Sequence, residues 1–148
     1  MPVIIKDEKA RIEFKIIGYQ FPNSPNSKKG DYNYDSNWLT IEFVCENENG
    51  RNVYRDSCLL TCELDDTVVS LEKIIDSEES AFISGYLEPY LKLSVAKTED
   101  KFAIVFFFVY DVKENKWLTF TVSETVSRER LISFKDELKE YLRAYSQK

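Results

Sequence analysis

The sequence predicts an α+β fold in which an antiparallel sheet of about six to seven strands carries two packed helices. Charged and apolar residues alternate over residues 11–17, and further apolar runs are separated by short turn segments. Two other segments repeat apolar residues at helical spacing. Strands that follow one another through hairpins pair antiparallel, and helices then bury their apolar stripes against the sheet. A chain of 148 residues is expected to form a single domain, residues 1–148.

Residues 11–17 open the predicted sheet, because their alternation has the period of a strand with one solvated face. The next segment, residues 22–37, is polar and contains Pro22, Pro25 and Gly30, so it predicts an irregular loop. Loops of this length are uncommon in compact domains and are often functional.

A β-hairpin is expected over residues 38–60. Asn49 and Gly50 lie between its two apolar segments, and this dipeptide is a strong hairpin signal because both turn positions require positive φ. A turn centred there places Asp56 opposite Phe43, among apolar side chains. That pairing puts a carboxylate on the buried face of the hairpin.

The first long helix is expected directly after the hairpin. Asp65 or Asp66 is predicted to cap its N-terminus by accepting hydrogen bonds from free backbone N–H groups. Val68, Leu71 and Ile75 then fall on one face of the helix. This face should pack against the sheet.

The second half of the chain is expected to supply further strands and the last helix. Alternation from Leu91 to Val95 predicts a half-buried strand. Residues 102–112 are almost continuously apolar, which predicts a central strand covered on both faces. A turn then leads to a strand that begins at Trp117, whose ring is expected in the core. Ser127 opens the last helix, and its apolar stripe comprises Leu131, Phe134, Leu138, Tyr141, Leu142 and Tyr145.

The sequence contains no histidine, and this narrows the chemistry available to the protein. A Ser-His-Asp triad or a Cys-His dyad cannot be built, and the usual imidazole general base is missing. The sequence also lacks a Gly-rich phosphate loop and a dinucleotide-binding fingerprint. We therefore predict that the protein is not an enzyme and has no metal or cofactor. Catalysis by a pair of carboxylates is the weakest alternative.

Charge and hydropathy restrict the partners and the location. The net charge of −6 disfavours direct contact with nucleic acid, and it fits either general solubility or attraction to a basic partner. The longest apolar run, residues 103–110, is too short to span a bilayer. The start of the chain lacks the features of a signal peptide. We therefore expect a cytoplasmic protein with no membrane partner.

The end of the long polar loop is a candidate contact segment. Tyr32 and Tyr34 alternate there with polar residues between Asp31 and Asp35. Tyrosine supplies a large contact area at a low entropic cost, so this composition is typical of binding surfaces. The alternative is that both tyrosines simply pack onto the sheet.

Several segments resemble the WapI-type immunity proteins. Tyr-Gln-Phe-Pro at residues 19–22, followed after a polar loop by Asp-Ser-Asn-Trp-Leu at 35–39, is similar to the opening signature of that family. Residues 56–64 and 87–91 resemble the segments that follow it in the same order. The likeness extends over about residues 10–95.

This resemblance implies an antitoxin function. Such proteins bind and block a toxin domain, often a nuclease, that a neighbouring bacterium delivers. The expected partner is therefore a cognate protein toxin. From charge and loop composition, the predicted partner-binding residues are Asp31, Tyr32, Tyr34, Asp35, Glu63, Asp65 and Asp66. The alternative function is a small-molecule or carbohydrate-binding domain that uses the aromatic loop.

Cys45, Cys58 and Cys62 are predicted to be reduced thiols, because an odd count in a reducing compartment disfavours a disulfide framework. Thiol titration of the unfolded protein without reductant should therefore find 3 free groups. Recovery of a single group would reveal a disulfide and contradict this prediction.

Overall fold

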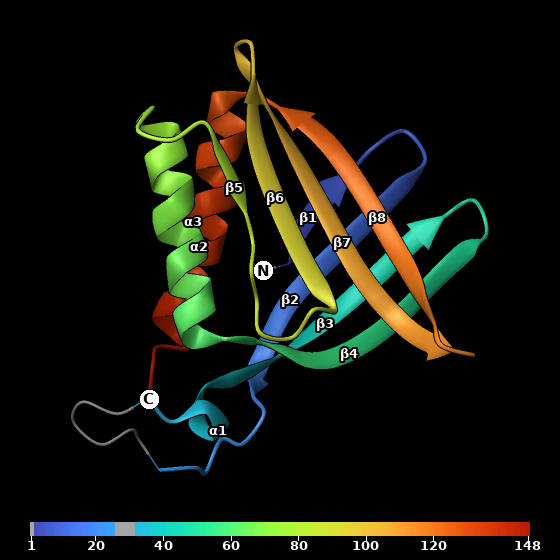
Figure 1. Cartoon of the computed structure of the whole chain (residues 1–148), viewed down its shortest axis with the longest axis vertical. Helices are drawn as coiled ribbons and strands as arrows, with labels where there is room; N and C mark the ends of the chain where they lie inside the picture. The colour runs from blue at the N-terminus through green and yellow to red at the C-terminus, as the bar shows by residue number, and fades with distance from the viewer. Residues whose placement is uncertain (1, 26–31) are drawn as a thin grey trace.

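The computed structural model describes residues 2–25 and 32–148, and it confirms an α+β fold built on antiparallel pairing (Figure 1). The described residues form two sheets of 4 strands each, in the orders β1-β2-β3-β4 and β5-β6-β7-β8. The expectation of one sheet of six to seven strands is therefore wrong. The strands have only one fully buried face, so two sheets bury their apolar faces against each other.

The first sheet is formed by the N-terminal part of the chain. Its strands are β1 Val3–Lys6, β2 Ala10–Tyr19, β3 Trp38–Asn47 and β4 Gly50–Leu60. The second sheet contains β5 Ala81–Ile83, β6 Leu91–Thr98, β7 Lys101–Lys113 and β8 Lys116–Val126. The two sheets are joined where β1 meets β8, because Lys6 N–H donates to Glu124 Oε1 at 3.0 Å.

The β3–β4 hairpin has a different register from the predicted one. Asn47 pairs with Gly50, so the turn is centred on residues 48–49 rather than on Asn49 and Gly50. The Asn47 side chain accepts from Asn49 N–H at 2.9 Å, and Gly50 adopts φ +135°. The local Asx-turn thus fixes the register two residues away from the expected one.

A shift of two residues leaves every side chain on its predicted face until the bulge between Leu39 and Ile41. Phe43 therefore lies opposite Tyr54, and Asp56 lies opposite Ile41, which is completely buried. The expected pairing of Asp56 with Phe43 is wrong. The Asp56 carboxylate nevertheless lies on the inner face of the hairpin in the observed register as well.

Strand β7 is central in its sheet, since it pairs with both β6 and β8. Its inner residues, such as Phe106 and Phe108, are buried, whereas Val105 and Phe107 on the outer face are only half-buried. The prediction of burial on both faces is therefore wrong. The Lys92 ammonium lies 5.4 Å from the centroid of the Phe107 ring and covers part of this outer face.

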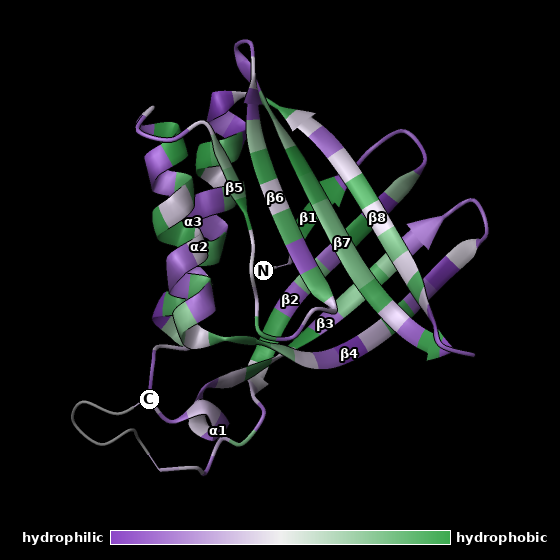
Figure 2. Ribbon diagram, in the orientation of Figure 1, coloured by the Kyte–Doolittle hydropathy of each residue, from purple (hydrophilic) through white to green (hydrophobic). Residues whose placement is uncertain are grey.

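Aromatic rings from both sheets form the middle of the core. Phe43 stacks on Phe108 with ring centroids 4.0 Å apart, and Phe14 stacks on Phe106 at 5.1 Å. Figure 2 shows apolar residues concentrated in the strands and polar residues at the hairpin tips. The interleaved rings hold the two sheets together because each buries a large apolar area.

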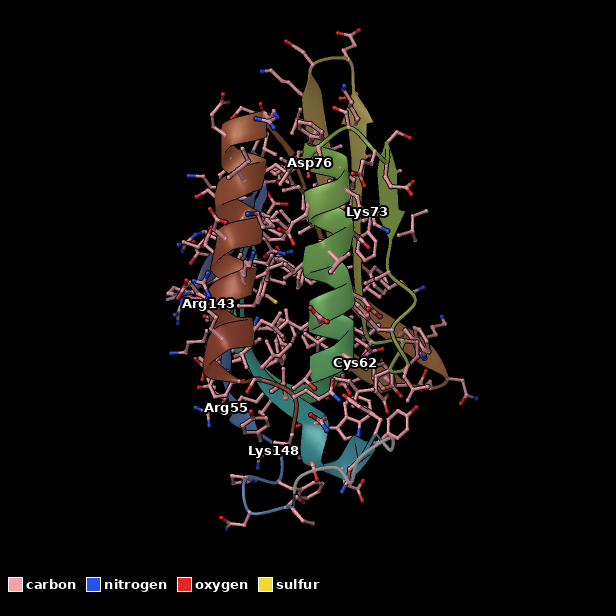
Figure 3. The ribbon with its side chains drawn as sticks, turned by 90° about the vertical axis from the view of Figure 1, so that its left-hand side faces the viewer. Arg55, Cys62, Lys73, Asp76, Arg143 and Lys148 are labelled. Carbon is pink, nitrogen blue, oxygen red and sulfur yellow. The ribbon has the colours of Figure 1, made fainter. Side chains whose placement is uncertain are left out.

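Two long helices, α2 Thr61–Ile75 and α3 Arg128–Ala144, lie side by side along one side of the sandwich (Figures 1 and 3). The short helix α1 spans Tyr34–Asn37. Within the described residues, no helix combines the length and apolar character needed to cross a membrane.

The N-terminal cap of α3 agrees with the prediction, whereas that of α2 does not. Ser127 caps α3 as predicted, because its hydroxyl accepts from Arg130 N–H at 3.1 Å. Helix α2 starts at Thr61, so Asp65 and Asp66 lie beyond its first turn and do not cap it. Glu63 fills that role by accepting from Leu60 N–H at 3.0 Å.

Leu138 tests the buried stripe of α3. Leu138→Ala is expected to lower the free energy of unfolding by about 2–5 kcal/mol, because the side chain is buried in the core cluster. The matched control Ser133→Ala changes an exposed residue of the same helix and should alter stability by less than about 0.5 kcal/mol. Equal effects in urea denaturation would show that the stripe is misassigned.

Candidate functional site

The start of α2 is the meeting point of several distant chain segments. Residues 32–37 approach it from before β3, residues 84–90 approach it from between β5 and β6, and Lys148 is held nearby (Figures 1 and 3). Many of the residues predicted to bind a partner come from these segments. Their side chains divide into two groups, those that hold the junction together and those that face outward.

Tyr32 belongs to the first group. Its hydroxyl lies 3.1 Å from Thr61 Oγ1 and accepts from Cys62 N–H at 3.3 Å. Burial raises the pKa of this phenol to about 12. Tyr32 therefore satisfies a free backbone donor in the first turn of α2, and its ring is half-buried.

Asn37 is the buried centre of the junction. Its Oδ1 accepts from the Thr61 hydroxyl at 2.7 Å and from Lys148 N–H at 2.8 Å. Its Nδ2 donates to Asn33 O at 2.7 Å and to Lys148 O at 3.2 Å. A fully buried amide with its donors and acceptors satisfied stabilises one arrangement of these segments. This residue of the sequence signature thus has a structural role.

Glu63 has a structural role in addition to its charge. One carboxylate oxygen accepts from Leu60 N–H, and the other accepts from Leu87 N–H at 2.6 Å. The pKa of Glu63 is raised mainly by burial, with repulsion from Asp66 and Glu88 adding to it. This side chain fastens the segment between β5 and β6 to the start of α2.

The remaining predicted residues face outward where they are described. Tyr34 is 54% exposed and packs edge-on against Tyr32, with ring centroids 5.0 Å apart. Asp35, Asp65 and Asp66 are exposed. Asp31 lies outside the described residues.

Exposed apolar side chains adjoin these acidic residues, and the sequence did not reveal them. Ile83 on β5 is 81% exposed, and Leu87 in the following segment is 63% exposed. Val69 on α2 is also exposed, and α2 contacts β5 directly. We call the set the α2–β5 surface, and its members are Tyr34, Asp65, Asp66, Val69, Ile83 and Leu87. The residues around Leu87 have no periodicity, so no pattern marked it.

Negative charge accumulates beside this surface without neutralisation. In the part of the chain that the structure describes, no Lys or Arg forms an ion pair with Asp56, Asp66 or Glu88. Burial raises the pKa of Asp56, and Glu88 raises it further by repulsion. These like charges oppose one another in the folded protein, so a cationic partner would relieve a cost that the fold carries.

In a groove between α3 and β2, by contrast, the charged side chains are neutralised. It encloses about 580 Å³ and is lined by Lys15, Ile16, Ser133, Asp136, Glu137, Glu140, Tyr141, Ala144 and Tyr145. Its charged groups are paired within the protein, for example Glu137 with Arg130 at 2.7 Å and Lys15 with Glu42 at 3.4 Å. Across residues 2–25 and 32–148, no cluster of three acidic or cysteine side chains could hold a metal ion.

An acidic, partly apolar surface held rigidly on a small α+β domain is typical of a module that binds another protein. A sequence model of the Immunity protein WapI-like family matches residues 3–146, so this chain belongs to that family. The resemblance drawn from the sequence is thereby confirmed, and it extends over nearly the whole chain. No curated protein matches the chain.

The Asp56 carboxylate provides a test of the electrostatics. Asp56→Asn is expected to raise the free energy of unfolding near neutral pH, because it removes a half-buried charge that faces Glu88. The folded-state pKa of Asp56 is raised, so the destabilisation exists above that pKa and is lost as the pH falls through it.

Urea denaturation should therefore show a larger gain at about pH 7 than at about pH 4.5, closer to the ordinary range of carboxyl groups. Asp65→Asn, an exposed change on α2, is the control and should have little effect at either pH. A pH-independent gain for Asp56→Asn would contradict the assignment.

Proposed function

We propose that this protein neutralises a cognate toxin by direct protein–protein contact through the α2–β5 surface. The observation that carries the proposal is that exposed Leu87 is held by Glu63, whose neighbours Asp66 and Glu88 are carboxylates that no described cation neutralises. Exposed apolar side chains with a polar surround are typical of protein interaction sites. Membership of the immunity protein family supports a toxin as the partner.

The charge of the surface indicates the chemistry of that toxin. Asp65 and Asp66 are exposed members of a chain with a net charge of −6, and this charge would attract a basic protein. A nuclease toxin fits, because proteins that grip nucleic acid phosphates present clustered Lys and Arg side chains. Complementary charge accelerates association, and this gain weakens as salt screens it.

The junction behind the surface favours tight binding. Tyr32 and Glu63 hold the start of α2 and the segment that carries Leu87 in place through side chain to backbone hydrogen bonds. A surface that is already ordered loses little conformational entropy on association. The protein would then act by occupying the toxin rather than by catalysis, and we place this encounter in the cytoplasm.

A small-molecule or carbohydrate ligand is the second candidate, and its strongest support is the groove between α3 and β2. Its volume of about 580 Å³ falls within the usual range of ligand sites. The predicted aromatic loop does not line this groove, and Tyr32 is engaged by the first turn of α2. The paired charges of the groove leave less reason for a ligand, so protein contact is favoured.

The proposal predicts which variants lose affinity for the toxin domain, once it is isolated by co-purification. Leu87→Ala and Tyr34→Ala should each raise the dissociation rate by about tenfold or more, as truncation of an interface anchor does. Asp66→Asn should slow association and reduce its dependence on ionic strength.

Val53→Ala is the matched control for these variants, because Val53 is 49% exposed on β4. It should leave both rates unchanged. Unaltered kinetics in folded Leu87→Ala, Tyr34→Ala and Asp66→Asn would place the interface elsewhere on the domain.

A further inference from the structure

A small cleft opens where the end of β7 meets the edge strand β4. It encloses about 160 Å³ and is lined by Asp56, Tyr90, Val109, Tyr110, Asp111 and Val112. Trp117 on β8 contacts one lining residue from outside the cleft, because its ring centroid lies 5.7 Å from that of Tyr90 and its indole is 46% exposed. The expectation that Trp117 is a core residue is therefore wrong.

Asp56 brings a carboxylate into this cleft from the inner face of the sandwich. Its cross-strand partner Ile41 is completely buried, so the two side chains share the face that packs in the core. The Asp56 carboxylate accepts from Ser57 N–H, and it forms no ion pair with any Lys or Arg of the described residues. The like charge of Glu88 raises the pKa of Asp56 instead of lowering it.

The cleft walls are aromatic as well as acidic. Tyr90 and Trp117 meet at an interplanar angle of 55°, and Tyr54 stacks on Tyr110 with centroids 5.2 Å apart. Faces of such rings attract cations, and the attraction grows when the cation loses water. A carboxylate beside aromatic faces is therefore a receptor for a positively charged, partly apolar group.

We propose that this cleft receives an arginine side chain of the protein that binds the α2–β5 surface. The guanidinium would pair with Asp56 and lie against Tyr90 and Tyr110, which both line the cleft. This inference rests on the proposed function, because it adds a specific anchor to the same interface.

Size and chemistry favour arginine over the other cations. A volume of about 160 Å³ lies below the usual range for drug-sized ligands, and it suits the end of a single side chain. The planar guanidinium stacks on aromatic rings and pairs with a carboxylate through two parallel N–H groups. It is also less strongly hydrated than the lysine ammonium, so entering a partly apolar cleft costs it less.

Residues 84–90, which run between β5 and β6 (Figure 1), carry Leu87 of the α2–β5 surface and Tyr90 of the cleft lining. Within this segment, Leu87 donates its N–H to Glu63, and the Tyr90 carbonyl at its end accepts from Val109 N–H at 2.8 Å. Tyr90 follows Leu87 by three positions, a span of at most about 10 Å for extended chain. A partner that covers Leu87 can thus reach the cleft with one long side chain.

A purely structural explanation of Asp56 makes a different prediction. Charges that point inward on an edge strand can discourage pairing with the edge of another molecule. If that were the only role, Asp56→Asn would self-associate and would keep any affinity for arginine. The cation-receptor role instead predicts a monomer that folds at least as well and binds arginine less.

The test is a nuclear magnetic resonance titration of the full chain with N-acetyl-arginine methylamide. The ring signals of Tyr90 and Tyr110, which line the cleft, should shift, whereas the indole N–H signal of Trp38 should not, with a dissociation constant in the range of about 1–50 mM. The citrulline analogue has nearly the same shape without the charge and should cause a much smaller shift. The lysine analogue should bind several-fold more weakly than the arginine compound.

Asp56→Asn should weaken arginine binding by about fivefold or more, and added salt should weaken it in the wild type. Asp76→Asn is the matched control, because it removes the same charge from an exposed residue at the far end of α2 (Figure 3). It should leave the affinity unchanged.

Three results would overturn the inference. They are no shift of the Tyr90 and Tyr110 ring signals up to about 100 mM arginine compound, an equal response to the citrulline analogue, and undiminished binding by Asp56→Asn. If any of these occurs while Leu87→Ala still weakens toxin binding, the proposed function stands without the arginine anchor. If arginine binds the cleft but Leu87→Ala and Tyr34→Ala leave the affinity for the toxin unchanged, the proposed interface is contradicted instead.

Discussion

The fold depends on one constraint, which is that its strands have a single apolar face. Even β7, the most apolar strand, leaves Val105 and Phe107 half-exposed on its outer side. Two such sheets must therefore bury their inner faces against each other, and the stack of Phe43 on Phe108 is the centre of that contact. The helices α2 and α3 then cover one side of the sandwich, and the start of α2 is held by the distant segments that meet there.

Stability and the proposed binding compete around the start of α2 and on the neighbouring edge strand β4. A helix start and an edge strand are tolerant places for carboxylates, yet Glu63 and Asp56 are both partly buried and both face further negative charge. Burial and like charge make Asp56 costly for the isolated domain, whereas Glu63 offsets that cost through two hydrogen bonds from backbone N–H groups. The aromatic core of the sandwich supplies stability far from this surface.

The sequence correctly predicted those features that neighbouring residues alone determine. The Ser127 cap and the stripe of α3 follow from neighbouring residues, and both are observed. The division into two sheets was not predictable, because periodicity shows that a face is buried but not what covers it. The hairpin register was missed for a related reason, since the Asn47 side chain competes with the Asn49-Gly50 signal.

The sequence predicted the negative charge of the candidate site. It did not predict which of the residues hold the fold together and which face outward. Exposure of Asp65 and Asp66 followed from their place on a polar helix face. The hydrogen bond from Cys62 N–H to the Tyr32 hydroxyl joins positions 30 residues apart. The local sequence around neither residue predicts it. The exposure of Leu87 also depends on tertiary structure, because only the fold turns that segment outward.

The contact between Glu63 and Leu87 has an evolutionary consequence. Glu63 holds the backbone N–H of Leu87 and leaves the side chain of that residue free. Any residue except proline can donate the same hydrogen bond, so the side chain at this position can be exchanged without loss of the anchor. If the α2–β5 surface binds the toxin as proposed, substitutions of this side chain can change the toxin that is recognised while the underlying fold is kept.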